Sequence, residues 1–334
     1  MIDTRFGAEW PRRCACIDIG TNSIKMLIAD VTPERAQRVY ENSVVTRLGE
    51  ALTANGGILG DAPMQRTLNA LEQMSVELGR NNPEYVRCVG TAALRIATNA
   101  PDFVAAAHER CGLEIEIIPG SEEARLSYLA VALDPVWRNL PNLKVIDVGG
   151  GSTEIIVPVG RSGSGETSGL SVSVGAVALT ERFGLDQAIS PDQLAAVRAE
   201  ARGLFAEAER MDSRAILSAH HGGTAAGVGG TLTTLAAICN GGIRDPAVVH
   251  GYELSTAAIE EAITRLAGRT VPERQTIPGL DPRRADIILG GAVALSAALE
   301  AIECTGIRVS TRGLRWGVLY DRFMRLPRTG GDTH

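Results

Sequence analysis

The sequence predicts an α/β protein built from two homologous domains, on three observations. Segments of strand character alternate with segments whose apolar residues recur at helical spacing, which is the pattern of α/β folds. One short motif occurs twice, as Asp18-Ile-Gly-Thr-Asn-Ser23 and as Asp147-Val-Gly-Gly-Gly-Ser152, each time between two apolar strands. The length of 334 residues suits two domains of ordinary size.

The first half of the chain predicts a sheet with helices around it. Short apolar runs indicate strands and apolar residues at 3.6-residue spacing indicate helices. On this basis we expect strands over residues 15–19, 24–31, 37–46, 86–89 and 115–118, and helices over residues 64–78, 93–97, 102–111 and 122–133.

The second half restarts the same pattern. We expect strands over residues 144–147, 154–159, 171–174, 225–228 and 307–310, a hairpin tip over 160–169, and helices over 191–210, 232–239, 287–302 and 314–325. The predicted domains are residues 1–126, with a C-terminal helix over 312–328 packing back on them, and residues 127–311. The cleft between two homologous domains is a natural ligand site.

Composition excludes several classes of protein. Hydrophobic residues make up 45% and charged residues 22% of the chain, as in a globular protein. The net charge of -6 argues against a broad nucleic-acid surface.

The six cysteines form no C-x-x-C pair, and we expect Cys14 and Cys16 to be core thiols in a reducing compartment. The first 13 residues lack an apolar core, and the uncharged run over residues 220–243 is too rich in glycine and threonine for lipid, so we expect a cytoplasmic protein without a membrane segment.

The repeated turn suits phosphate and metal chemistry. Its glycines let backbone amides approach phosphate oxygens, and Ser23 or Ser152 adds a hydroxyl. Asp18 and Asp147 offer oxygen ligands for Mg²⁺, and Glu154 would share a strand face with Ser152. The structural alternative is that glycines close hairpins and aspartates cap turns. Because the motif occurs twice, phosphate and metal binding is the better interpretation. The predicted phosphate-binding residues of these turns are Gly20, Thr21, Asn22, Ser23, Gly149, Gly150, Gly151 and Ser152.

Three more segments are candidates on weaker grounds. Gly90-Thr91 and the turn that contains Gly229, Gly230 and Thr231 each follow a buried strand and open a helix, where an anion is favoured. Arg95 follows the first of these turns, and either a bound anion or a salt bridge would explain it. Ser121-Glu-Glu-Ala-Arg125 opens a helix that we expect Ser121 to cap, and acidic residues in a first turn are ordinary.

These residues together resemble the exopolyphosphatase and guanosine pentaphosphate phosphohydrolase (Ppx/GppA) family over nearly the whole chain. Eight segments occur in the family's order. They are DIGTNSIKMLI from Asp18, GTAALR from Gly90, GSEEARLSY from Gly120, VIDVGGGSTE from Val145, SVGAVALTERF from Ser173, GVGGTLTTLAAI from Gly227, IPGLDPRRADIILGGA from Ile277 and STRGLRWGVLY from Ser310.

The resemblance implies two ribonuclease-H-like domains of the actin-like, sugar-kinase and heat-shock-chaperone fold, with an interdomain cleft. It implies that Glu123 is the catalytic base, that Arg95 binds phosphate, and that Asp147 and Glu154 serve the metal and the attacking water. The predicted metal ligands are Asp18, Asp147 and Glu154, and the predicted metal is Mg²⁺ or Mn²⁺. The implied reaction is hydrolysis of the terminal phosphoanhydride of inorganic polyphosphate, which releases orthophosphate. The alternative substrate is a guanosine penta- or tetraphosphate, with conversion of the pentaphosphate to the tetraphosphate. A metabolite kinase of the same fold and a non-catalytic alarmone sensor remain alternative functions. Whether the chain forms a homodimer is left open.

The sequence departs from the family's longer members in two respects that bear on the substrate. It ends soon after the last predicted helix, so we expect no accessory C-terminal domains and release of long chains between cleavages. Arg312 and Trp316 stand where many members carry an acidic residue at one or both places. The candidate cations for the rim of the site are Arg283, Arg284, Arg312 and Arg315.

Overall fold

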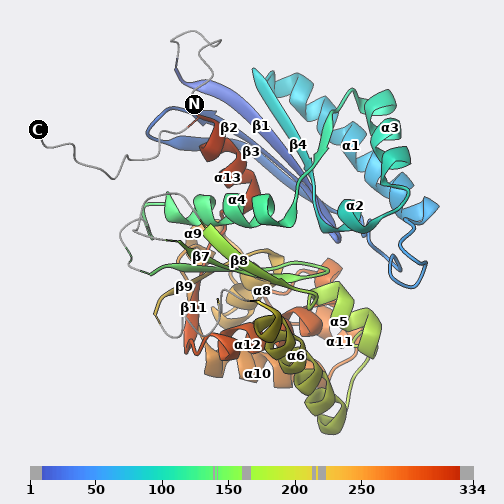
Figure 1. Cartoon of the computed structure of the whole chain (residues 1–334), viewed down its shortest axis with the longest axis vertical. Helices are drawn as coiled ribbons and strands as arrows, with labels where there is room; N and C mark the ends of the chain where they lie inside the picture. Colours follow the sequence, from blue (N-terminus) through green and yellow to red (C-terminus); the bar gives the residue numbers. More distant parts are fainter. Residues whose placement is uncertain are drawn as a thin grey trace, which may run out of the picture. The chain divides into compact units, whose positions relative to one another are not determined.

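The computed structural model describes residues 10–137, 140, 142–159, 167–212, 216 and 223–323 (Figure 1). The chain divides into two compact units. Unit 1 comprises residues 1–133 and 314–334, and unit 2 comprises residues 134–313. Unit 2 is therefore an insertion in the sequence of unit 1.

Unit 1 contains a five-stranded sheet in the order β3-β2-β1-β4-β5. β1 pairs antiparallel with β2 and parallel with β4, so the sheet is mixed. Its strands are β1 (Arg12–Ile19), β2 (Ser23–Val31), β3 (Ala36–Val45), β4 (Tyr85–Gly90) and β5 (Ile115–Ile117), and its helices are α1 (Asp61–Asn81), α2 (Ala92–Ile96), α3 (Ala100–Cys111), α4 (Gly120–Ala132) and α13 (Leu314–Phe323). Every strand and helix predicted for the first half is present, with shifted ends.

The two faces of β1 belong to two separate hydrophobic clusters, because side chains alternate along a strand. Ala15, Ile17 and Ile19 pack in the cluster that includes residues of α1 and α3. Cys14 and Cys16 pack in the cluster that includes residues of α4 and α13. Both thiols are fully buried, as predicted for core cysteines. Figure 1 shows α1 and α3 on one side of this sheet and α4 with α13 on the other.

Helix α13 packs closely against α4. A Cβ atom on Gly317 would lie 1.8 Å from the carbonyl oxygen of Leu126, so only glycine fits at this position. Arg315 of α13 also donates a hydrogen bond of 2.9 Å to the carbonyl oxygen of Met26 in β2. The last described helix of the chain therefore completes unit 1 and supports α4 from behind.

Unit 2 contains a six-stranded sheet in the order β10-β11-β9-β6-β7-β8. Its strands are β6 (Lys144–Val148), β7 (Thr153–Pro158), β8 (Thr167–Val172), β9 (Ala225–Val228), β10 (Glu253–Ser255) and β11 (Gly306–Val309). Its helices are α5 (Ala176–Phe183), α6 (Pro191–Met211), α8 (Gly230–Cys239), α9 (Pro246–Val249), α10 (Thr256–Ala267), α11 (Val271–Gln275) and α12 (Ile288–Ala301), with the 3-10 turn η1 (Pro282–Arg284).

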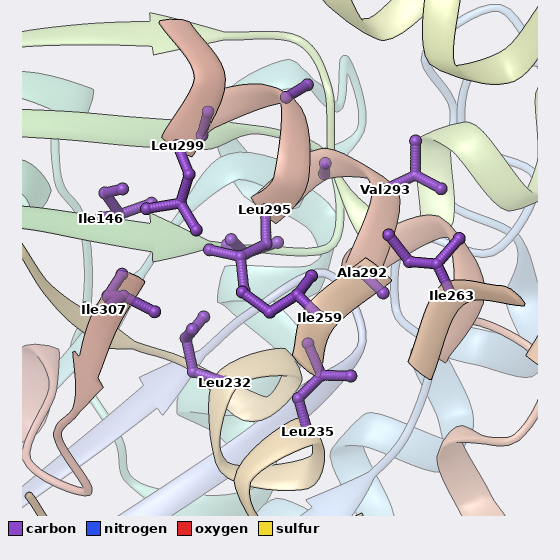
Figure 2. Close-up of a cluster of buried hydrophobic side chains, with 14 of the residues drawn as sticks. Ile146, Leu232, Leu235, Ile259, Ile263, Ala292, Val293, Leu295, Leu299 and Ile307 are labelled. Carbon is purple, nitrogen blue, oxygen red and sulfur yellow. The ribbon is translucent and has the colours of Figure 1, made fainter. Parts of the chain in front are cut away.

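Helix α12 forms the centre of the unit 2 core. Almost all its residues are buried, and it carries no charged residue before Glu300. Figure 2 shows Leu295 and Leu299 of α12 among apolar side chains from α8, α10, β6 and β11. Aliphatic side chains fill this core, as the 4% aromatic content requires.

The two sheets share one topology, which confirms the internal repeat. Read from β8, the sheet of unit 2 runs β8-β7-β6-β9-β11, which matches β3-β2-β1-β4-β5 in unit 1. The antiparallel and parallel pairings also correspond, and β10 is an additional edge strand in unit 2.

Some local predictions were wrong or incomplete. β8 ends at Val172 instead of 174, because its register is set by pairing with β7, from Thr153↔Val172 to Pro158↔Thr167. α4 begins at Gly120, and the amides of Glu122 and Glu123 both bind the Pro119 carbonyl, so Ser121 is not its cap. Five elements of unit 2 were not predicted from the sequence: α5, α9, β10, α10 and α11. Residues 160–166 of the predicted hairpin tip and 324–328 of the predicted last helix lie outside the described residues.

The uncharged run over 220–243 contains β9, a glycine turn and α8 in its described part, as predicted. Within the described part of the chain, no helix is long and apolar enough to cross a bilayer.

Candidate functional site

The two copies of the repeated turn have nearly the same backbone. The Gly20 amide donates to the Ser23 carbonyl at 3.1 Å, and the Gly149 amide donates to the Ser152 carbonyl at 2.9 Å. A Cβ atom on Gly20 would lie 3.2 Å from the Ser23 carbonyl oxygen, and one on Gly149 would lie 3.1 Å from the Ser152 carbonyl oxygen. Glycine at the first position therefore allows the same tight turn in both units.

The turn of unit 1 pairs an acid with a base. Asp18 and Lys25 stand opposite each other on β1 and β2. Lys25 Nζ lies 3.8 Å from Asp18 Oδ2, which is an ion pair but too long for a hydrogen bond. Within the described residues, the buried side-chain amide of Asn22 donates to no acceptor. This unit thus presents an ammonium and an amide as donors beside its glycine turn.

The turn of unit 2 pairs two acids. Asp147 on β6 stands opposite Glu154 on β7. Glu154 Oε1 accepts hydrogen bonds from Ser152 Oγ at 2.6 Å and from Ser171 Oγ at 2.9 Å. These two hydroxyls orient the carboxylate, and the same position in unit 1 is occupied by Lys25.

A second glycine turn of unit 2 lies against Asp147. Gly229 has φ +102°, and a Cβ atom there would lie 3.0 Å from Asp147 Oδ1. Gly229 and Gly230 lead into α8, whose first amides point toward the turn. Unit 2 thus brings together the predicted residues Asp147, Gly229 and Gly230.

The four candidate rim cations differ in their partners. Arg283 binds Asp281 through two nitrogens, at 2.7 and 3.0 Å. Arg312 lies 3.1 Å from Asp134, and Arg315 lies 2.8 Å from Glu41. Among the described residues, the Arg284 guanidinium makes no hydrogen bond or ion pair, and burial lowers its pKa. A Cβ atom on Gly230 would lie 2.3 Å from Arg284 Cζ, so this guanidinium covers the start of α8.

The predicted catalytic pair of unit 1 is in contact. Arg95 Nη1 lies 2.6 Å from Glu123 Oε2 and also donates to the Ile118 carbonyl at 3.1 Å. The side chains of Arg95 and Glu123 are 24% and 18% exposed, so the pair is largely buried but reachable. Glu123 lies in the first turn of α4, and Arg95 lies in the last turn of the short helix α2. Of the two explanations for Arg95 that the sequence left open, a bound anion or a salt bridge, the structure shows a salt bridge with Glu123.

The donor set of unit 2 fits a hydrated divalent cation. In the described ranges, no group of three or more His, Cys, Asp or Glu side chains is placed to hold a metal. Mg²⁺ commonly takes one or two carboxylates and completes its shell with waters and substrate phosphates. Asp147 and Glu154, as opposed carboxylates beside a glycine turn, meet that requirement. Asp18 differs, because Lys25 already neutralises part of its charge.

Three residues near these groups were not singled out from the sequence: Lys25, Ser171 and Arg125. A signal existed for Lys25, because position 25 follows Asp18 by the same seven residues that separate Glu154 from Asp147. Ser171 and Arg125 gave no such signal, because their partners depend on strand register and on the packing of α13.

Comparisons with known proteins identify the family of the chain. The model described as "Ppx/GppA phosphatase family" matches residues 27–326. The chain is 33% identical over 307 residues to Exopolyphosphatase 2 of Mycobacterium tuberculosis, which covers 88% of this chain and 92% of that protein. It is 28% identical over 299 residues to the bifunctional 3-dehydroquinate synthase/phosphatase of Fusobacterium nucleatum, covering 86% of this chain and 43% of that protein.

Solved structures show the same fold. The PPX-GPPA enzyme of Aquifex aeolicus is 29% identical with a TM-score of 0.74, covering 93% of this chain and 99% of its own. The exopolyphosphatase of Cytophaga hutchinsonii is 26% identical with a TM-score of 0.80, covering 92% and 97%. These neighbours confirm the predicted actin-like class of duplicated α/β units. The chain belongs to the Ppx/GppA phosphatase family.

Proposed function

We propose that this protein is an exopolyphosphatase, which hydrolyses the terminal phosphoanhydride of inorganic polyphosphate and releases orthophosphate. The observation that carries the proposal is the contact of Glu123 with Arg95 at the start of α4. A carboxylate beside a guanidinium places a base next to a phosphate-binding cation. The relative with 33% identity is an exopolyphosphatase by name, which supports the same reaction.

In this mechanism, Glu123 orients the attacking water and takes its proton. Arg95 stabilises negative charge on the transferred phosphoryl group, which is where most catalysis of such reactions resides. The turn of unit 1 supplies backbone amides, the Ser23 hydroxyl and the Asn22 side-chain amide. That buried amide has no acceptor within the described chain, so a phosphate oxygen would satisfy it.

Unit 2 has its own groups for binding phosphate and a metal. Asp147 and Glu154 would hold Mg²⁺ or Mn²⁺, which when bound neutralises phosphate charge. The amides of Gly150 and Gly151 and the start of α8 are donors for phosphate oxygens, whereas the Gly149 amide closes the turn on the Ser152 carbonyl. Arg284 adds a guanidinium at the same helix start, beside Gly230.

Guanosine pentaphosphate 5'-phosphohydrolysis is the second candidate, because it breaks the same kind of bond and differs in the leaving group. The family's description names both activities in one phosphatase family. A kinase of the same fold is less well supported, since Glu123 would activate water, and a non-catalytic sensor would not need to retain Glu123, Asp147 and Ser152.

The test compares Glu123→Gln with Glu122→Gln, two neighbouring isosteric changes on one helix. We expect Glu123→Gln to lower kcat by ~10²–10⁴ with little change in KM, because the base is lost and the shape is kept. Glu122→Gln should remain near the native rate. Phosphate release from polyphosphate, guanosine pentaphosphate and ATP, measured side by side, identifies the substrate. Near-native turnover of Glu123→Gln would refute the assignment.

A second comparison uses the neighbouring arginines Arg283 and Arg284. Arg284→Met should raise KM for polyphosphate about tenfold, since a charged hydrogen bond to phosphate contributes roughly 1.5–3 kcal/mol. Arg283→Met should leave KM nearly unchanged, because Arg283 is bound to Asp281.

We also expect partial digests of long polyphosphate to show a ladder of intermediate lengths on a gel. Full-length polymer beside free phosphate alone would instead show processive digestion.

A further inference from the structure

Three charged or titratable side chains of unit 2 meet where the chain enters and leaves this unit. Asp134 is the first residue of unit 2, and Arg312 stands one residue before its last. Arg312 Nη1 and His250 Nε2 lie 3.1 and 3.3 Å from the same oxygen, Asp134 Oδ2. Asp134 is almost fully buried. The two ends of unit 2 are therefore held together at one carboxylate, which a histidine also contacts.

The second ring nitrogen of His250 is an acceptor. The Thr311 backbone amide donates to His250 Nδ1 at 3.3 Å, and Thr311 Oγ1 lies 3.2 Å from the same nitrogen. A nitrogen that accepts from an amide carries no proton, so the neutral ring bears its proton on Nε2, toward Asp134. The Trp137 ring packs perpendicular to the imidazole, with the ring centroids 4.9 Å apart. The imidazole is thus held from three sides.

A second proton on His250 would have to go to Nδ1. Both ring nitrogens of a charged imidazole are donors, so Nδ1–H would then face the Thr311 N–H, and that amide would lose its acceptor.

Charge acts in the same direction as this loss. Burial alone would raise the pKa of Asp134, but the contacts with His250, with the Val136 amide and with Arg312 lower it on balance, so the carboxylate stays ionised. Arg312 already neutralises that carboxylate, and a charged His250 would therefore add an uncompensated positive charge at a buried acid.

We propose that His250 is a pH-sensitive latch on residues 311–313, through which the chain leaves unit 2 to form α13. The neutral ring holds this segment at the Thr311 amide, and the protonated ring releases it. Histidine side chains ordinarily change charge between about pH 5 and pH 8, so the latch works in that range. Asp134 and His250 have no part in the reaction proposed above, so the latch can be tested without reference to activity.

The experiment is hydrogen exchange of the Thr311 amide, expressed as a protection factor so that the intrinsic effect of pH on exchange is removed. We expect protection to fall about tenfold from pH 8 to pH 5, which corresponds to the loss of roughly one hydrogen bond. The Val309 amide donates to the Tyr252 carbonyl at 2.9 Å and should stay protected at both pH values. It is the internal reference that separates local release from global unfolding.

Two histidine variants make the test specific. His250→Asn keeps an acceptor near the Nδ1 position but takes no proton, so Thr311 protection should change less than about twofold between the two pH values. The matched control is His108→Asn, because His108 also contacts an acid, with its Nδ1 3.1 Å from Glu114. That variant should keep the native fall in protection.

Nitrogen chemical shifts of the native imidazole at pH 8 are a second test, which needs no variant, and they should show the proton on Nε2. Equal Thr311 protection at pH 8 and pH 5 in the native protein would overturn the proposal. So would a His250→Asn variant that still loses protection, or a neutral His250 protonated at Nδ1.

Discussion

The two copies of the repeated turn share a backbone and differ in charge. Each is closed by an amide-to-carbonyl bond between a glycine and a serine three residues later. Opposite the aspartate, however, unit 1 places Lys25 and unit 2 places Glu154. One turn is therefore nearly neutral and the other doubly negative. The difference teaches that the glycines set the shape of such a turn, whereas a single cross-strand residue decides whether it can attract a cation.

The largest effect expected from this difference is on metal dependence. Asp147→Asn should lower kcat by ~10² or more at moderate Mg²⁺ and shift the activating concentration upward, because one of two carboxylate ligands is lost. Asp18→Asn should have a much smaller effect on the Mg²⁺ requirement, because Lys25 already neutralises Asp18. Activity titrated with Mg²⁺ and Mn²⁺ checks both variants. Equal shifts in the two would contradict the difference that we infer from Lys25.

The second effect is on stability, and it depends on how closely a neighbouring glycine packs against each turn. A Cβ atom on Gly175 would lie 2.4 Å from the Gly150 oxygen, which is backbone, whereas one on Gly49 would lie 2.4 Å from the Thr21 methyl, which can rotate. We expect Gly175→Ala to destabilise the fold by about 3 kcal/mol and Gly49→Ala by about 1 kcal/mol. Chemical denaturation of the two variants measures the difference. Equal losses would mean that the Thr21 side chain is as fixed as the backbone.

The third effect is a pH dependence that belongs to unit 2. Hydrogen bonds from Arg283 lower the pKa of Asp281 to about 2. Because the folded pKa lies below the unfolded value of about 3.9, the stabilisation is complete above about pH 4 and is lost as the pH falls through 2. Asp281→Asn should therefore cost at most about 2 kcal/mol at pH 7 and almost nothing at pH 2. Unfolding free energies at several pH values test this, and a constant difference would contradict it.

The smallest expected effect is on substrate binding by the neutral turn. Lys25→Met should raise KM for polyphosphate about threefold, because the ammonium makes no hydrogen bond within the described chain and can donate to phosphate. The increase should shrink at high salt, since exposed charge interactions are screened. Lys25→Arg serves as the control that keeps the charge. An unchanged KM at low salt would show that Lys25 only balances Asp18.

The sequence was enough to predict the class of fold because both of its signals are local. The motif from Asp18 to Ser23 and its copy from Asp147 to Ser152 identified the duplication, and strand and helix periods identified the elements of unit 1. Several elements of unit 2 were missed. α10 had a readable signal in Ile259, Ile263 and Leu266 at helical spacing. β10 is three residues long and is defined by pairing with β11, so its sequence alone carries no strand pattern.

Site residues could be predicted from the sequence only where they belong to a recognisable motif. Glu123 was an ordinary first-turn acid by its residues alone, and the family resemblance singled it out. Its contact with Arg95 joins positions 28 residues apart and depends on the folded sheet. The hold of Arg125 on Asp321 joins positions 196 residues apart, and no local pattern encodes such a pairing.

The insertion of unit 2 within unit 1 has a consequence for biosynthesis. A ribosome makes α4, then all of unit 2, and only afterwards α13, which packs against α4 through Gly317. Since chains begin to fold during synthesis, the sheet of unit 2 has all its strands before the first unit receives its last helix. Until then the nascent helix that carries Glu123 lacks its packing partner. The helix that carries Glu123 therefore reaches its final packing only after residues 314–323 have been made, later than every described strand of unit 2.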